Sequence, residues 1–306
     1  MPKLETVGFV GLGVMGSALS GHLLRAGYDV VGYDIAPRRL AEHVARGGAP
    51  AAGPADVGAR ARVAVTSLPS ARALAEVTRG DGGLAARPAA GLIVLETSTL
   101  PIEVKEEARQ LLAARGVTLL DCPLSGTGEQ ARRGDVIAYL SGDETAKAGA
   151  APVVAAMTRA CHDVGPFGGG SKMKFIANLL VTVHTLAAAE ALLLARRAGL
   201  DLPAVLEAVG DGAGTSRMFE IRGPLMAEEN YPGSSMPTAL FGKDIQIITD
   251  FAGRLGSPTP LFSLASVFHR AALAQGRGDD DLACLYAVLE QLAADGHSDT
   301  GDRYGH

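Results

Sequence analysis

The chain has 306 residues, of which 47% are hydrophobic and 20% are charged, and its net charge at pH 7 is −5. This length allows two domains with separate cores, and the composition is ordinary for a globular protein. An acidic balance without a run of Lys or Arg argues against nucleic acid and against a membrane surface as partners.

The cysteines and the first residues bear on the cellular compartment. Cys122, Cys161 and Cys284 show neither C-x-x-C spacing nor an even number, which argues against a disulfide framework and against a zinc site. The first strand is expected by Thr6, which leaves no room for an export signal. We therefore expect a cytoplasmic protein without a metal site.

The first predicted elements form a βαβ unit. Residues 6–34 read TVGFVGLGVMGSALSGHLLRAGYDVVGYD, a strand, a glycine turn, an amphipathic helix and a strand that ends in an acid. In a G-x-G-x-x-G turn the first glycine allows the tight bend, the second admits a pyrophosphate and the third lets helix and strand pack closely. The residues that we expect to bind a dinucleotide here are Gly11, Gly13, Val14, Met15, Gly16 and Asp34.

The acid at the end of the second strand favours NAD over NADP. A carboxylate at Asp34 accepts hydrogen bonds from free ribose hydroxyls and repels a 2′-phosphate. Arg38 and Arg39 follow closely and could grip a phosphate, but on a helix after Pro37 such arginines are more often a solvated face. We expect NAD, with NADP as the less favoured cofactor.

Strands and helices continue to alternate through the first half. The pattern predicts a helix near 38–46, strands at 62–67 and 91–97, a helix at 102–115, and strands at 117–121 and 136–141. This rhythm is typical of a Rossmann domain, with a doubly wound, mostly parallel sheet. Ligands bind such sheets at the carboxyl ends of the strands, so we expect Leu68 and Pro69 to contact the cofactor.

The second half is predicted to be all helical. A long helix is expected over about 171–198, followed by helical segments near 202–210, 218–226, 238–255, 260–275 and 281–293. The apolar stretch 175–195 contains Asn178, His184 and Glu190, which favours a buried core helix over a membrane span.

These patterns divide the chain into three parts. We predict a Rossmann domain over 1–167, an all-α domain over 168–295 that a long helix links to it, and a polar tail over 296–306. The glycine-rich stretch 165–170 is expected to be a hinge that borders a cleft.

The helix after the hinge carries the best catalytic candidates. Lys174 and Asn178 are four residues apart, so they share one helix face. A lysine that opens a buried apolar helix is unusual, although a snorkelling charge at the domain surface explains it as well.

The ordered motifs resemble those of the β-hydroxyacid dehydrogenase family over nearly the whole chain. The similar stretches are the glycine motif, 96–101 (ETSTLP), 121–126 (DCPLSG), 165–178 and 241–244 (FGKD). The resemblance implies that Thr99 contacts the nicotinamide, and that Ser125 and Gly126 hold the substrate carboxylate. It also implies the roles in the second half, where Lys174 is the acid/base, Asn178 orients it, Lys243 lies against the cofactor and Asp244 organises the site.

Three positions depart from the family pattern. Thr127 stands where a second glycine is usual, and we expect its side chain near the substrate. Met236 replaces a common phenylalanine, and Cys122 replaces a common alanine. These departures leave the identity of the substrate open.

The resemblance implies NAD-dependent conversion of a small β-hydroxy acid to its semialdehyde or keto acid. Two alternatives remain. One is an imine reductase, but imine reductases of this fold typically replace the catalytic lysine. The other is a non-catalytic dinucleotide-binding module, and the presence of Lys174, Asn178 and Ser125 together argues against it. Fold analogy and the long apolar helix favour a homodimer or homotetramer.

Overall fold

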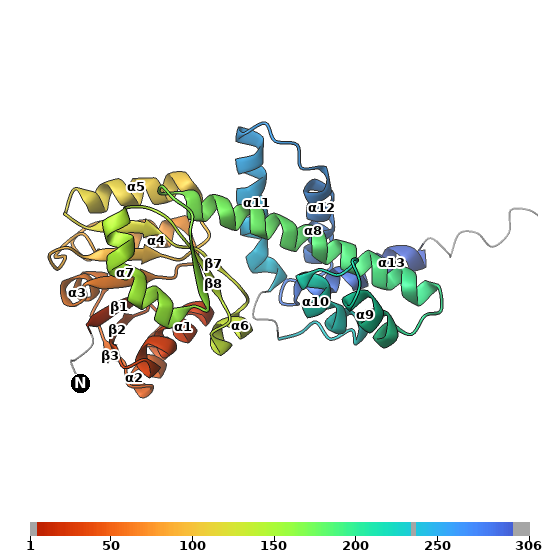
Figure 1. Ribbon diagram of the computed structural model, residues 1–306, viewed down its shortest axis with the longest axis horizontal. Coiled ribbons are helices and arrows are strands. Elements are labelled where there is room, and N and C mark those ends of the chain that lie inside the picture. Colours follow the sequence, from red (N-terminus) through yellow and green to blue (C-terminus); the bar gives the residue numbers. More distant parts are fainter. Residues whose placement is uncertain (1–4, 234–236, 296–306) are drawn as a thin grey trace, which may run out of the picture. The chain divides into compact units, whose positions relative to one another are not determined.

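The computed structural model describes residues 5–233 and 237–295 (Figure 1). The predicted tail over 296–306 and the departure at Met236 lie outside the described residues. The chain divides into two compact units, a sheet unit over 1–174 and a helical unit over 175–306. This division falls inside the helix Gly169–Arg197, whereas the predicted boundary after residue 167 falls just before that helix. The assignment of functional domains stays a prediction.

The sheet unit is built on a six-stranded parallel sheet with the order β3-β2-β1-β4-β5-β6. Its strands are β1 (Thr6–Val10), β2 (Asp29–Tyr33), β3 (Ala49–Pro50), β4 (Val63–Thr66), β5 (Ile93–Glu96) and β6 (Thr118–Asp121). Val7 of β1 pairs with Val30 of β2 on one side and with Val63 of β4 on the other. The direction of winding therefore reverses beside β1, where doubly wound sheets bind their ligands.

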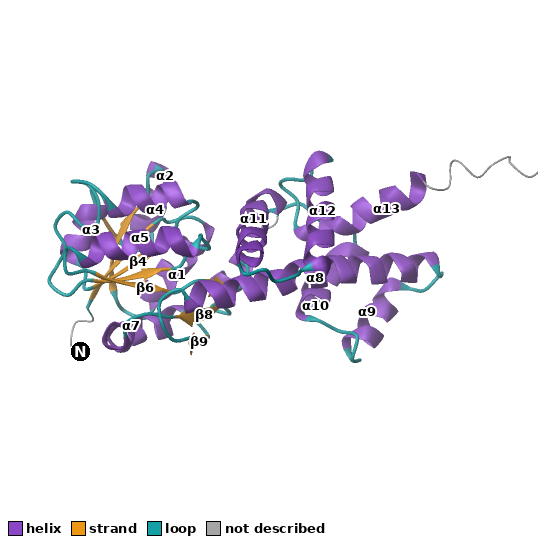
Figure 2. Ribbon diagram, turned by 90° about the horizontal axis from the view of Figure 1, so that it is seen from above, coloured by secondary structure: helices purple, strands orange, loops and turns teal. Residues whose placement is uncertain are grey.

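Helices cover both faces of this sheet (Figures 1 and 2). They are α1 (Val14–Arg25), α2 (Pro37–Ala45), α3 (Pro54–Arg60), α4 (Ala71–Thr78), α5 (Ile102–Ala113), α6 (Gly128–Arg133) and α7 (Glu144–Met157). Neighbouring strand residues enter opposite cores: Phe9 packs with α1 and α7, and Val10 with α3, α4 and α5. Burial on both faces explains the continuous apolar strands, and the predicted doubly wound fold is confirmed.

A second, three-stranded sheet follows the first. It consists of β7 (Leu124–Ser125), β8 (Ile137–Leu140) and β9 (Ala160–Asp163), with β8 antiparallel to β7 and parallel to β9. The strand predicted over 136–141 forms as β8, but it lies outside the six-stranded sheet. The sequence did not indicate β9, because its residues are mostly exposed and show no apolar alternation.

The described part of the helical unit contains helices and no strand. Its elements are most of α8 (Gly169–Arg197), then α9 (Leu202–Gly210), α10 (Arg217–Ala227), α11 (Thr238–Arg254), α12 (Pro260–Ala274), a 3₁₀ turn (Leu282–Cys284) and α13 (Leu285–Asp295). Leu192, Phe219 and Tyr286 lie in its core. The prediction of a helical second half is confirmed.

One described helix, α8, is long and apolar enough to cross a membrane, judged by length and composition only. Core helices of soluble proteins share this length and composition. Buried residues at both ends of α8, such as Ser171 and Ala195, fit a core helix better.

Candidate active site

The glycine turn after β1 has the geometry of a phosphate-binding loop. Gly11 has a φ of +91°, and a Cβ there would overlap the carbonyl oxygen of Ser67. A Cβ at Gly16 would overlap the carbonyl oxygen of Gly11. A Cβ at Gly13, in contrast, would meet nothing closer than Arg39 Nη1 at 3.6 Å. The chain itself therefore requires the first and third glycines, and the second leaves open space for a ligand.

Helix α1 begins directly at this open space. Gly13 is its N-cap and supplies no side chain to bond the first turn, which contains Val14 and Met15. The first N–H groups of a helix have no partner within it, and together with the helix dipole they favour an anion. The predicted pyrophosphate position thus fits the structure.

Asp34 is locked in place at the end of β2. Its Oδ2 accepts a hydrogen bond from Leu12 N at 2.7 Å, and its Oδ1 accepts one from Ala36 N at 2.8 Å. Each oxygen keeps a further lone pair, so the carboxylate can still accept ribose hydroxyls. Arg39 Nη1 lies 3.8 Å from Oδ2, whereas Arg38 is exposed to solvent and forms an ion pair with the glutamate one turn further along α2. This arrangement fits NAD.

The loops after β4 and β5 are bonded to each other. Ser98 Oγ accepts a hydrogen bond from Leu68 N at 2.8 Å, and Ser98 N donates to Glu96 Oε1 at 3.1 Å. Pro69 follows Leu68, and the partly exposed Thr99 follows Ser98. Because the carboxyl ends of parallel strands meet at one edge, these residues lie at the same edge as the glycine turn.

The predicted substrate loop is closed by a helix cap. Gly126 has a φ of +144°, and it lies between Ser125, at the end of β7, and Thr127. Thr127 Oγ1 accepts from Gln130 N at 3.3 Å, and Thr127 N donates to Gln130 Oε1 at 2.9 Å, which is a capping box. The hydroxyl keeps its own proton, so Thr127 can still donate a hydrogen bond to a ligand.

A fully buried ion cluster, absent from the sequence-based predictions, lies beneath these loops. Lys105 Nζ is 2.8 Å from Glu96 Oε2 and 2.8 Å from Asp121 Oδ1, and all three side chains are fully buried. Burial alone lowers the pKa of a lysine, but the two carboxylates outweigh it and raise the pKa of Lys105 above its ordinary value. The two carboxylates therefore favour the ammonium form of Lys105.

The same cluster holds the start of α8. Asp121 Oδ2 accepts from Ser171 N at 2.7 Å, and Asp121 Oδ1 accepts from Ser171 Oγ at 2.9 Å. Ser141 Oγ accepts from Gly170 N at 2.9 Å. Lys174, one turn further along α8, is buried and belongs to the sheet unit.

The helical unit brings together three of the predicted site residues. Asn178 Nδ2 donates to Asp244 Oδ2 at 2.8 Å, and Lys243 Nζ donates to Asp244 Oδ1 at 2.7 Å. Asn178 and Asp244 are buried. The bond between Asn178 and Asp244 was not predicted, because they are far apart in the sequence and belong to different helices.

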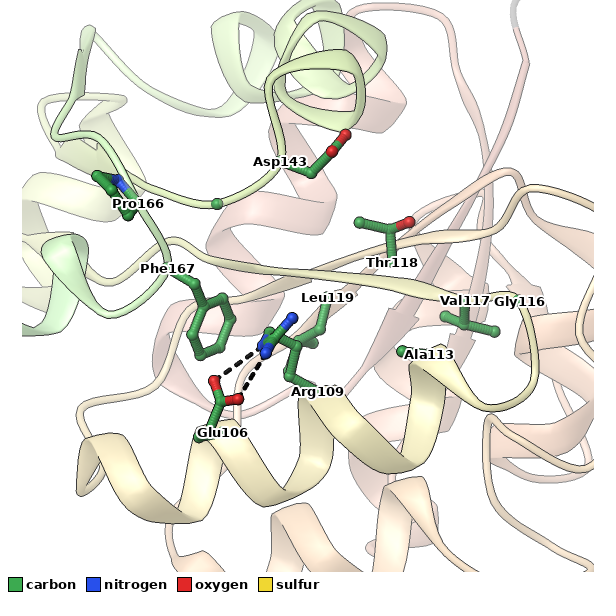
Figure 3. A pocket seen from close by; sticks show the side chains of 11 residues that line it. Glu106, Arg109, Ala113, Gly116, Val117, Thr118, Leu119, Asp143, Pro166 and Phe167 are labelled. Carbon is green, nitrogen blue, oxygen red and sulfur yellow. Dashed lines mark hydrogen bonds and ion pairs between the residues drawn. The ribbon is translucent and has the colours of Figure 1, made fainter.

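A cavity of about 670 Å³ in the sheet unit contains none of the predicted site residues (Figure 3). Glu106 and Arg109 of α5, the start of β6 and Phe167 line part of it. Glu106 bonds two nitrogens of Arg109 at 2.8 and 2.6 Å, and the guanidinium lies 5.4 Å from the centre of the Phe167 ring. The charge of Arg109 is thus neutralised, and we assign no ligand to this cavity.

Among the described residues, no group of His, Cys, Asp and Glu has the geometry to hold a metal ion. The cysteines are free: Cys122 and Cys284 are buried and Cys161 is exposed. Burial raises the pKa of the Cys122 thiol, which makes it an unreactive core residue.

Both halves of the chain match known protein families. Residues 6–165 match the family model described as the NAD binding domain of 6-phosphogluconate dehydrogenase. Residues 168–289 match the model described as the NAD-binding of NADP-dependent 3-hydroxyisobutyrate dehydrogenase.

Similar proteins match nearly end to end. L-threonate dehydrogenase of Cupriavidus necator is 36% identical over 92% of this chain and 95% of its own length. NAD-dependent L-serine dehydrogenase of Pseudomonas aeruginosa is 30% identical over 94% of this chain and 98% of its own length. The crystal structure of 3-hydroxyisobutyrate dehydrogenase from Salmonella typhimurium has a TM-score of 0.83 and 32% identity, and the match covers 93% of this chain and all of that one. An imine reductase from Pseudomonas sp. is only 18% identical with a TM-score of 0.59, which shows a likeness of fold alone.

Proposed function

This chain belongs to the β-hydroxyacid dehydrogenase family, and we propose that it interconverts a small β-hydroxy acid and its semialdehyde or keto acid with NAD as cofactor. The observation that carries the proposal is the presence, in one compact unit, of an open glycine turn, a locked Asp34 and a buried Lys174. The first two fit NAD, and the third supplies an acid/base.

Each residue is proposed to perform one task. Bound at the glycine turn and Asp34, NAD would supply the hydride acceptor for the carbon that bears the hydroxyl, and NADH would supply the hydride donor in the reverse direction. Lys174 Nζ takes the hydroxyl proton in oxidation, which requires the neutral amine, and donates it in reduction as the ammonium. Asn178, itself held by Asp244, orients the amine. Ser125 and Gly126 bind the substrate carboxylate beside the reacting carbon, with Thr127 as a further donor.

The substrate class is proposed from the family and from this loop. The relatives are named for L-threonate, L-serine and 3-hydroxyisobutyrate, which are small acids with a hydroxyl group. The extra hydroxyl of Thr127 favours a substrate with a second polar group. The predicted contact of Lys243 with the cofactor stays a prediction.

A screen of these three acids with NAD, followed through NADH absorbance, tests the proposal. We expect turnover of at least one of them and a lower kcat/KM with NADP. NAD binding without turnover of any hydroxy acid, or turnover of cyclic imines instead, would contradict it. The imine alternative is disfavoured because Lys174 is present.

We also propose a cytoplasmic homodimer or homotetramer. Exposed apolar side chains line up along two helices: Ile176 and Leu180 on α8, and Leu261 and Leu264 on α12. Residues three or four apart share a helix face, and contiguous apolar patches are typical of subunit interfaces. The molar mass from light scattering should exceed that of one chain, and Leu264→Glu should lower it.

A further inference from the structure

We propose that Lys105, together with Glu96 and Asp121, is a positioning residue that ties the start of α8, and with it Lys174, to the cofactor-binding edge of the sheet. The inference rests on the proposed function, because it concerns the placement of the proposed acid/base. Lys105 is fully buried and is not among the predicted ligand-binding residues, so it acts through the two carboxylates.

The contacts of the cluster run in two directions. On one side Glu96 Oε1 accepts from Ser98 N, and Ser98 Oγ accepts from Leu68 N, so the cluster fixes two loops at the cofactor edge. On the other side Asp121 accepts both the N–H and the hydroxyl of Ser171 in the first turn of α8. Lys105 lies between them and joins the two sides.

Asp121 acts as an N-cap supplied by another element. The first N–H groups of a helix need partners from outside it, and a carboxylate there also interacts favourably with the helix dipole. Asp121 bonds Ser171 N, and Ser141 bonds Gly170 N. Lys174 is three residues beyond Ser171, so it shares a face with the residue that Asp121 holds.

Fold stability alone is a weak reason for such a cluster. A buried ion pair often stabilises a protein no more than well-packed apolar residues of the same volume. Here two carboxylates face one ammonium, which leaves one surplus buried negative charge. Glu96 Oε2 lies 2.8 Å from Lys105 Nζ and accepts no hydrogen bond from any other described residue. What this arrangement provides is a fixed distance between two parts of the site.

Two variants of different severity test the proposal. Ser171→Ala removes one bond to Asp121, and the double variant Lys105→Met/Glu96→Gln removes the ion pairs without adding net charge. We expect kcat to fall about fivefold in the first and at least about tenfold in the second, with the Kd for NAD changed less than twofold, since lost bonds to charged groups have effects of this order. The primary deuterium isotope effect on kcat should rise, because chemistry becomes slower than product release.

The matched control is Leu112→Ala, on the same buried face of α5 as Lys105. It should lower Tm at least as much as the double variant, because it leaves a core cavity, but kcat should stay within twofold. Equal loss of kcat in the control and the double variant, or an unchanged kcat in the double variant, would overturn the positioning role.

Hydrogen exchange separates this inference from the proposed function. Amides over 169–177 should exchange at least about tenfold faster in the double variant than in the control, whether or not a substrate is known. Absence of turnover in the wild type would then contradict the proposed function alone. Unchanged exchange would contradict the tether.

Discussion

The sheet unit and the helical unit each hold part of the proposed site with one carboxylate, but in different ways. Asp121 of the sheet unit is fully buried and bonded by Lys105, Ser171 and Ser141, which come from three separate segments. Asp244 of the helical unit is bonded by Asn178 and by Lys243, whose side chain is 37% exposed.

This difference indicates that one carboxylate holds its partners in a fixed position, whereas the other lets its partners rearrange. Moving a buried charge away from its partners costs several kcal/mol, whereas an ion pair that reaches solvent contributes about 0–1 kcal/mol and can rearrange. We infer that the cluster around Asp121 fixes where Lys174 stands, and that Asp244 adjusts the side chain of Asn178. The predictions below test this division, from the largest expected effect to the smallest.

Lys174→Ala should abolish turnover and leave NAD affinity nearly unchanged. A positioned acid/base contributes about 10²–10⁴-fold, and the residues proposed to hold most of the cofactor come from the preceding part of the sheet unit. Steady-state kinetics and NAD titration measure the two effects. If the variant keeps more than about a tenth of the wild-type kcat, Lys174 is not the acid/base. The cluster around Asp121 would then have no catalytic group to position.

Asp244→Ala should lower kcat by about 10–100-fold, less than loss of Lys174. The variant leaves the buried Asn178 amide without its carboxylate, and a lost hydrogen bond to a charged group is worth about 1.5–3 kcal/mol. Gln246→Ala, at an exposed position of the same helix, is the control and should have no effect. An effect as large as that of Lys174→Ala would mean that Asp244 does more than adjust the side chain of Asn178.

Asp34→Ser should raise the ratio of kcat/KM for NADP to that for NAD by at least about tenfold. The change removes the carboxylate that repels a 2′-phosphate. Arg39, which lies 3.8 Å from that carboxylate in the wild type, is then left to bind the phosphate. Adding Arg39→Ala should cancel the gain, and adding the solvated Arg38→Ala should not. A wild type that already prefers NADP would show that Asp34 does not select the cofactor.

A smaller effect concerns acid stability, for which the described residues of each unit include one buried histidine. Burial lowers the pKa of both His43 and His269, so the unfolded chain binds the proton more readily. Stability should therefore fall as the pH drops below about 6.5, the ordinary pKa of histidine.

Glutamine variants measure the contribution of each unit. His43→Gln or His269→Gln should reduce the difference in Tm between pH 7.5 and pH 5.5 by about 2 °C. A reduction with only one variant would identify the unit that unfolds first in acid. No reduction with either would show that these side chains gain protons as easily folded as unfolded.

The features that local rules govern were predictable. The glycine turn, α1 and the acid at the end of β2 follow from backbone geometry within a short stretch of chain, and the structure places Asp34 beside that turn. The shared face of Lys174 and Asn178 follows from the helical period alone. Roles beyond this came from the family resemblance, and the assignment of individual site residues stays a prediction.

The buried ion cluster was missed because its bonds join distant parts of the sequence. A signal was nevertheless present: Lys105 stands where an apolar residue is expected, on one face with Ala108 and Leu112. A lysine in an apolar stripe needs buried carboxylates, but the sequence does not say which ones. The strands β7 and β9 were missed for other reasons: β7 has only two residues, and the residues of β9 are mostly exposed and show no apolar alternation.

The capping box at Thr127 narrows the evolutionary options of this enzyme. A residue that both caps α6 and lies in the proposed substrate loop can be exchanged at low cost only for another good cap: Ser, Asn, Asp or the glycine that is usual in the family. An apolar replacement would cost about 1 kcal/mol in the cap alone. Lineages that descend from this sequence should therefore diversify their substrates here by exchanging one polar group for another or by returning to glycine, and should acquire larger apolar side chains at other positions.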